Sequence, residues 1–135
     1  MREIKFRVWD KSSSQMSIET ISLSDWGDYL IDFKDGAVDV AADYVVWLQY
    51  TGLKDKNGME IYEGDVIRVK HDDGRYDIGN IVYGSKGAFC LHLPNVGTGI
   101  KTPLLNYIHG IMFAEFDFEV IGNIYEHPEL LEANQ

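Results

Sequence analysis

The chain has 135 residues, 45% of them hydrophobic and 25% charged, and no apolar run reaches the length of a membrane helix. Its 12 Lys and Arg residues face 22 Asp and Glu residues, and the net charge of −10 argues against binding duplex DNA through its phosphates. We therefore expect a compact protein with a basic or apolar partner. Because the start of the sequence lacks the apolar region of a signal peptide, we also expect a cytoplasmic location and no membrane contact.

The first part of the chain predicts short strands around one irregular segment. Residues 4–9 alternate apolar and basic side chains with the period of a half-buried strand, and residues 15–21 are expected to pair back as a hairpin. Residues 22–43 combine spaced acids with scattered aromatics, so we expect a short helix or irregular segment, then a turn at Gly36. Residues 44–50 are rich in β-branched and aromatic types, which predicts a further strand.

Glycines punctuate the stretch that follows. Gly52 lets the chain leave the preceding strand, and Gly58 closes an Asn-Gly turn that permits a positive φ. Gly64 and Asp65 then introduce another strand. We interpret this stretch as a folding instruction of a small β-protein and not as a ligand loop.

The remaining elements continue the same pattern. Strands are expected at residues 66–70, 78–83, 88–93 and 116–125. Pro128 suits the first position of a closing helical turn. Short strands joined by short polar turns are typical of a meander, which at this size closes into a small barrel or packs as a sandwich.

No motif spells out a reaction. A calcium loop starting at Asp55 would need its glycine at the sixth position, and here Gly58 occupies the fourth. The histidines lack the spacing of a zinc site, and Cys90, the lone cysteine, lies between apolar neighbours as core cysteines do. We therefore expect no metal, no cofactor and no enzymatic activity.

A segment without acids offers a candidate binding surface. Residues 78–114 contain two lysines and no Asp or Glu, so an anion would meet no local repulsion there. Tentative binding residues in this segment are Tyr83, Lys86, Lys101, Tyr107 and His109. Mixed aromatic and basic side chains are typical of single-stranded nucleic-acid binders, but core packing of the aromatics, or a protein contact through residues 102–114, explains the pattern equally well.

Three stretches in this order resemble the YopX-like proteins of bacteriophages and prophages. They are "REIKFRVWD" at residues 2–10, "QYTGLKDKNGMEIYEGDVI" at 49–67 and "FEVIGNIYEHPELL" at 118–131, and together they cover about a third of the chain. His127 stands where an asparagine is more usual in the family. The resemblance implies an SH3-like β-barrel, here residues 51–135, with an N-terminal β extension at residues 1–50 that carries the irregular insert.

The resemblance brings no catalytic residues, since the family has no established biochemical activity. Its motif residues are expected to be structural: Gly52, Gly58, Gly64, Asp65, Gly122, Asn123 and Pro128. We therefore expect an accessory protein of a phage or prophage that acts through contacts with a host or phage protein and with copies of itself. The alternative is a small barrel that binds single-stranded nucleic acid through residues 78–114.

Overall fold

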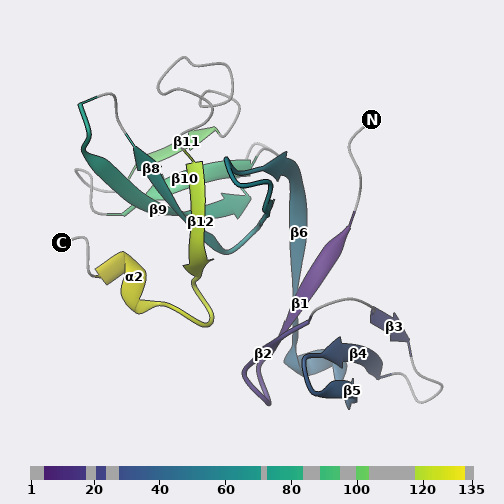
Figure 1. Cartoon of the computed structure of the whole chain (residues 1–135). Coiled ribbons are helices and arrows are strands. Elements are labelled where there is room, and N and C mark those ends of the chain that lie inside the picture. The colour runs from purple at the N-terminus through teal and green to yellow at the C-terminus, as the bar shows by residue number, and fades with distance from the viewer. Residues whose placement is uncertain are drawn as a thin grey trace. The chain divides into compact units, whose positions relative to one another are not determined.

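The computed structural model describes residues 5–17, 21–23, 28–70, 73–83, 89–94, 100–103 and 118–132 (Figure 1). In these residues the protein is mainly β, and helix is confined to the 3₁₀ turn η1 (Ala42–Tyr44) and the short helix α2 (Glu129–Glu132). No helix in the described part of the chain is long and apolar enough to cross a membrane. The chain divides into two compact units, Met1–Tyr50 and Thr51–Gln135.

The first unit begins with an antiparallel ladder. Strand β1 (Phe6–Asp10) pairs with β2 (Gln15–Met16) and with the first half of β6 (Val45–Lys54). Val8 faces Trp47 across this ladder, so the two side chains share one face of the sheet. The strand predicted at residues 4–9 is present as β1, but its burial does not alternate: Phe6 is 43% exposed, whereas Val8, Trp9 and Asp10 are all buried.

A second ladder occupies the segment for which the sequence predicted a short helix or irregular structure. Strands β3 (Ile21–Leu23), β4 (Tyr29–Phe33) and β5 (Gly36–Val40) pair antiparallel in that order. This prediction was wrong for residues 29–40. The turn expected at Gly36 exists, but it is a two-residue hairpin turn that joins two strands, with Phe33 paired to Gly36.

The first unit has a small core of its own. Side chains from β1, β4 and β5 pack together, with partly buried residues from β3, β4 and β6 beside them. The buried members are Val8, Ile31, Phe33 and Val40, and the partly buried ones are Ile21, Tyr29 and Val45.

Strand β6 runs through the boundary between the units without a linker. Its residues from Val45 to Gln49 pair with β1, and the strand continues to Lys54, where it neighbours β7 (Glu60–Tyr62). The sequence predicted that the chain leaves the strand at Gly52. Instead Gly52 lies within β6 with a φ of 88°, so the glycine bends the strand and does not end it.

The second unit is built on a meander whose last strand returns to its first. Its strands are β8 (Asp65–Lys70), β9 (Tyr76–Tyr83), β10 (Phe89–Leu93), β11 (Ile100–Pro103) and β12 (Phe118–Asn123). All neighbours pair antiparallel, in the order β11-β10-β9-β8-β12. The strands predicted at residues 66–70, 78–83, 88–93 and 116–125 correspond to β8, β9, β10 and β12.

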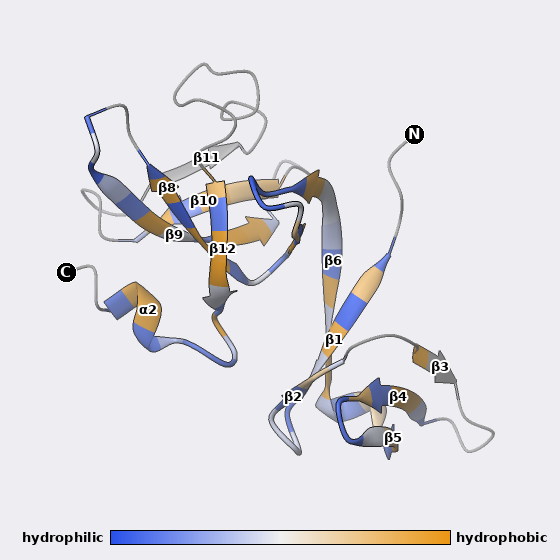
Figure 2. Cartoon of the chain, in the orientation of Figure 1, coloured by the Kyte–Doolittle hydropathy of each residue, from blue (hydrophilic) through white to orange (hydrophobic). Residues whose placement is uncertain are grey.

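One face of this sheet forms the main core. Hydrophobic and hydrophilic residues are mixed along β8 and β12 (Figure 2), and Ile67 and Val69 of β8 and Phe118 of β12 face this core. The buried cluster consists of Ile61, Ile67, Val69, Ile81, Phe89, Leu91, Leu93 and Phe118. Across β9 and β10 the backbones come very close, since a Cβ at Gly79 would lie 2.3 Å from the carbonyl oxygen of His92.

Candidate protein-interaction surface

Tyr83 is the one tentative binding residue whose side chain the structure describes. It ends β9, faces Phe89 across the ladder and meets that ring edge-on, with 5.0 Å between the centroids. Tyr83 is 52% exposed whereas Phe89 is buried. The buried Phe89 ring therefore holds the exposed Tyr83 ring in place at the surface of the second unit.

The other tentative binding residues are not gathered around Tyr83 by the described part of the structure. Lys101 lies on β11 opposite His92, three residues along β10 from the partner of Tyr83. At about 3.3 Å per residue, this separates the two backbone positions by roughly 10 Å along the sheet. Lys86, Tyr107 and His109 lie outside the described residues.

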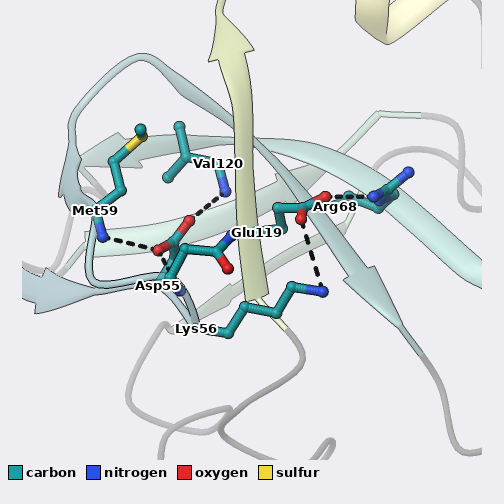
Figure 3. A network of polar contacts seen from close by, with 7 residues as sticks. Asp55, Lys56, Met59, Arg68, Glu119 and Val120 are labelled. Atoms are coloured by element: carbon teal, nitrogen blue, oxygen red, sulfur yellow. Dashed lines mark hydrogen bonds and ion pairs between the residues drawn. The ribbon is translucent and has the colours of Figure 1, made fainter.

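Asp55 is the centre of a polar network that locks the turn after β6 to β12 (Figure 3). One carboxylate oxygen accepts hydrogen bonds from the backbone N–H groups of Asn57 (2.8 Å) and Met59 (2.9 Å). The other accepts one from the N–H of Val120, at 2.9 Å. Since Asp55 is buried and its oxygens already accept backbone donors, this carboxylate shapes the chain and is poorly placed to hold a ligand.

Glu119 continues this network on the outer side of β12. Its carboxylate pairs with the guanidinium of Arg68 and lies 3.6 Å from the ammonium of Lys56 (Figure 3). Partial desolvation acts to raise the pKa of Glu119, but the hydrogen bond and charge of Arg68, followed by Lys56, lower it below its usual value. Arg68 also lies over the ring of Tyr76, 4.8 Å from its centroid, so these charges are already engaged within the protein.

The motif residues at the start of β8 hold the turn from β7. The carboxylate of Asp65 accepts the N–H of Tyr62 at 2.7 Å, and Asp65 is 1% exposed. Gly64, with a φ of 88°, donates its N–H to the carbonyl of Ile81 and accepts the N–H of Ile124, both at 2.9 Å. These groups tie β7, β9 and the end of β12 together around one turn.

The motif residues at the end of β12 organise the C-terminal turn. The side-chain oxygen of Asn123 accepts the N–H groups of Tyr125 (3.1 Å) and Glu126 (2.8 Å). Gly122 follows an irregularity in the register with β8, and a Cβ there would lie 2.8 Å from the His127 ring and from Leu130. Helix α2 begins just after Pro128 and packs against β9.

A surface in the first unit has the chemistry of an interface. Phe6 on β1, Tyr29 on β4 and Trp47 on β6 form what we call the aromatic patch. The Trp47 ring meets Phe6 at 5.9 Å and Tyr29 at 5.2 Å between centroids, both edge to face. Phe6 is 43% and Trp47 42% exposed, while Tyr29 packs against the core of the unit. Such pairs are favourable, so the patch presents large, ordered apolar area to its surroundings.

Sequence patterns gave part of the signal for this patch. The alternation of residues 4–9 placed Phe6 on the face of Val8, and the same period places Trp47 opposite Val8. The pattern did not reveal how far strands β4 and β5 extend over β1. Val8 is buried by β4 and β5, whereas Phe6 lies two pairs further along the ladder and stays exposed.

Metal ligands do not cluster in the part of the chain that the structure describes, and the single cysteine is buried. No group of three or more His, Cys, Asp or Glu side chains there is arranged to hold a metal ion. Cys90 is buried in β10 and forms no disulfide. The protein is thus a mainly β protein whose described surface carries exposed large apolar side chains, among them Phe6, Trp47 and Tyr83.

Comparison with known proteins gives the family. The family model of the YopX protein matches residues 5–132, and the chain belongs to the YopX family. The fold is similar to the crystal structure of protein EF1440 from Enterococcus faecalis, with a TM-score of 0.63, 27% identity and coverage of 97% of this chain and 99% of that chain. It is also similar to the crystal structure of yopX from Bacillus subtilis, with a TM-score of 0.56, 21% identity, and coverage of 96% and 98%. No curated protein matches the sequence.

Proposed function

We propose that this protein is an accessory protein of a bacteriophage or prophage that works in the bacterial cytoplasm, without catalysis, by binding other proteins. Membership of the YopX family supports the setting. The observation that carries the mode of action is the aromatic patch, because protein interfaces are enriched in exposed, ordered aromatic side chains. Its partners are a host or phage protein and, through the same patch, copies of the chain.

We further propose that the second unit is an SH3-like barrel. The order β11-β10-β9-β8-β12 supports this assignment, because a meander whose last strand pairs with its first can curl around one core. The irregularity between Val120 and Gly122 adds the local bend that such curling needs. Barrels of this size host many functions, so this assignment supports the proposed binding role only in part.

Affinity capture from bacterial cells tests the proposed function. The tagged protein is compared with the double variant Phe6→Ser/Trp47→Ser, which removes the exposed rings of the aromatic patch. The control is Tyr76→Ser, which removes a ring of similar exposure from the second unit. Recovered proteins should be lost with the double variant and kept with the control, provided that urea unfolding shows both variants folded. Equal recovery from all three proteins would contradict the role of the patch.

Binding of single-stranded nucleic acid is a second candidate function, favoured by the exposed ring of Tyr83 on the acid-free segment. Bases stack on such rings, and lysines at positions 86 and 101 would add positive charge. Splitting each capture into nuclease-treated and untreated halves separates the two candidates. Partners lost on nuclease treatment, together with weaker retention of Lys86→Glu/Lys101→Glu on single-stranded nucleic acid, would favour the second.

A further inference from the structure

We propose that the free edge of β5 docks an extended segment of a partner protein in which basic and apolar residues alternate, as an added strand. This inference rests on the proposed function and gives the chemistry of one partner. Within the described residues, β5 pairs with β4 and has no neighbour on its other side. Four of its five residues are exposed, and Figure 1 shows the strand at the border of its sheet.

The hydrogen-bonding groups of this edge follow from the hairpin. Phe33 and Gly36 flank a two-residue turn, and such flanking residues exchange both of their backbone hydrogen bonds. Since hydrogen-bonded and non-bonded pairs then alternate, the N–H and C=O groups of Ala37 and Asp39 are directed away from β4. An incoming strand would find these groups in the geometry of a normal ladder.

The side chains on the two faces of β5 decide what the added strand should carry. Val38 shares the core-side face with Ile31 yet is 48% exposed, and in the described part of the chain no strand pairs with β5 beyond it. On the opposite face, Asp39 pairs with Leu30 of β4, and Asp32 lies two pairs further along on that same face. An added strand would therefore extend the core with apolar residues on one face and meet carboxylates on the other.

Charge separates a basic partner from a second copy of this chain. Asp35 in the turn, Asp39 in the strand and Asp43 after it are all exposed, with Lys34 as the single base in residues 30–43. Two β5 edges paired together would bring these carboxylates against one another, and like charges across a ladder are destabilising. A strand with lysine or arginine at alternate positions would find complementary charge instead.

A fluorescence anisotropy titration tests the proposal with the full-length protein. The probe is a short labelled peptide in which lysine alternates with valine. Its controls are the same peptide with N-methyl groups at alternate residues, which cannot pair as a strand, and a peptide in which glutamate replaces lysine. We expect binding of the first peptide that weakens with salt, and roughly tenfold or more weaker binding of both controls.

Protein variants locate the site. Ala37→Pro removes a donor from the free edge while keeping the hydrogen bonds to β4, and it should weaken the peptide roughly tenfold. The matched control is Ala41→Pro, just beyond β5, where the φ of −64° already suits proline. Asp35→Lys/Asp39→Lys should abolish binding, whereas Glu129→Lys/Glu132→Lys, with the same change of net charge on α2, should retain it.

Several results would overturn the inference. They are equal binding of the N-methylated peptide, unchanged binding by Ala37→Pro, equal losses from the two charge variants, and no binding at all. Conversion of a self-associated protein to monomers by Ala37→Pro, without peptide binding, would assign the edge to a second copy. If the peptide fails while Phe6→Ser/Trp47→Ser still loses its captured partners, only this inference falls and the proposed function stands.

Discussion

Single carboxylates carry much of the local structure of this protein. Asp55 reaches from the Asn-Gly turn to the backbone of Val120, 65 residues away in sequence. The sequence indicated the turn, since Asn57-Gly58 is a strong local signal. It gave no sign of the link to β12, because no short-range pattern records which backbone donor a carboxylate will find after folding.

Replacing Asp55 by asparagine should destabilise the second unit by about 1–3 kcal/mol. The asparagine oxygen can still accept hydrogen bonds, but its NH₂ group is a donor and would face a backbone N–H group that is also a donor. Urea unfolding followed by circular dichroism measures the change. Asp73→Asn is the control, since Asp73 lies in an exposed turn and should shift stability by at most about 0.5 kcal/mol. Equal effects of the two variants would contradict the central role of Asp55.

Asp10 should make the stability of the first unit dependent on pH. Burial raises the pKa of Asp10, but hydrogen bonds from the hydroxyl and N–H groups of Ser12 and Ser13 outweigh this and lower it below its usual value. One Asp10 oxygen accepts the Ser12 hydroxyl and the other the Ser13 hydroxyl, each at 2.5 Å. A lowered folded-state pKa means that this stabilisation is present above the unfolded pKa of about 4 and is lost as the pH falls through the folded value.

Unfolding free energies measured between neutral and acidic pH should therefore fall less steeply for Asp10→Asn than for the unaltered protein. Ser13→Ala removes one of the hydroxyl donors and should give an intermediate slope. Thermal unfolding at a series of pH values, followed through the tryptophans of the first unit, provides the comparison. Parallel pH profiles for all three proteins would show that Asp10 does not contribute.

At the level of elements, strands β8, β9, β10 and β12 of the second unit were predicted, but β11 was not, and the first unit was predicted less well. Strands β8, β9 and β10 have clear polar turns between them in the sequence. Strand β4 was not predicted, because Leu30 on its outer face breaks the alternation of apolar and polar side chains between Tyr29 and Phe33. Pairing with β3 and β5 stabilises this segment as a strand, and such pairing between strands is not visible in a local pattern.

The close contact between β9 and β10 should not tolerate a side chain at Gly79. In Gly79→Ala the new methyl group would meet the carbonyl oxygen of His92 at 2.3 Å, and we expect a loss of about 1–3 kcal/mol from the forced separation of the strands. Gly58→Ala is the comparison, because its Cβ has open space and its cost of roughly 1 kcal/mol comes only from the φ of 82°. A lower denaturant midpoint for Gly79→Ala than for Gly58→Ala would support this account, and the reverse order would contradict it.

The aromatic patch and the β5 edge show where prediction of a candidate site from the sequence ends. Phe6 and Trp47 were recognisable as strand residues, but their exposure depends on how far β4 and β5 extend over β1. The acid-free segment was conspicuous in the sequence because charge is easily counted there. Of its tentative residues, only Tyr83 has a described side chain, so that hypothesis stays a prediction.

For the whole molecule, net charge is the dominant property. With a charge of −10 and a pI near 4.6, we expect the protein to be repelled by a phosphate backbone at neutral pH. A labelled DNA duplex should therefore show no binding in an anisotropy titration, even at low salt where nonspecific contacts are strongest. Saturable binding of the duplex would contradict this expectation and would require a local basic surface outside the described residues.

The burial of Cys90 makes the rate of thiol labelling a measure of local opening of the protein. Cys90 is buried, so a thiol reagent reaches its sulfur chiefly when the structure around it opens, and because the sequence has one cysteine, every labelling event reports the same place. When reclosing is faster than labelling, the observed rate divided by that of a free thiol is the fraction of time spent open. Mass spectrometry of a timed labelling series would thus give the free energy of the opening that exposes Cys90, in native buffer and without any substitution.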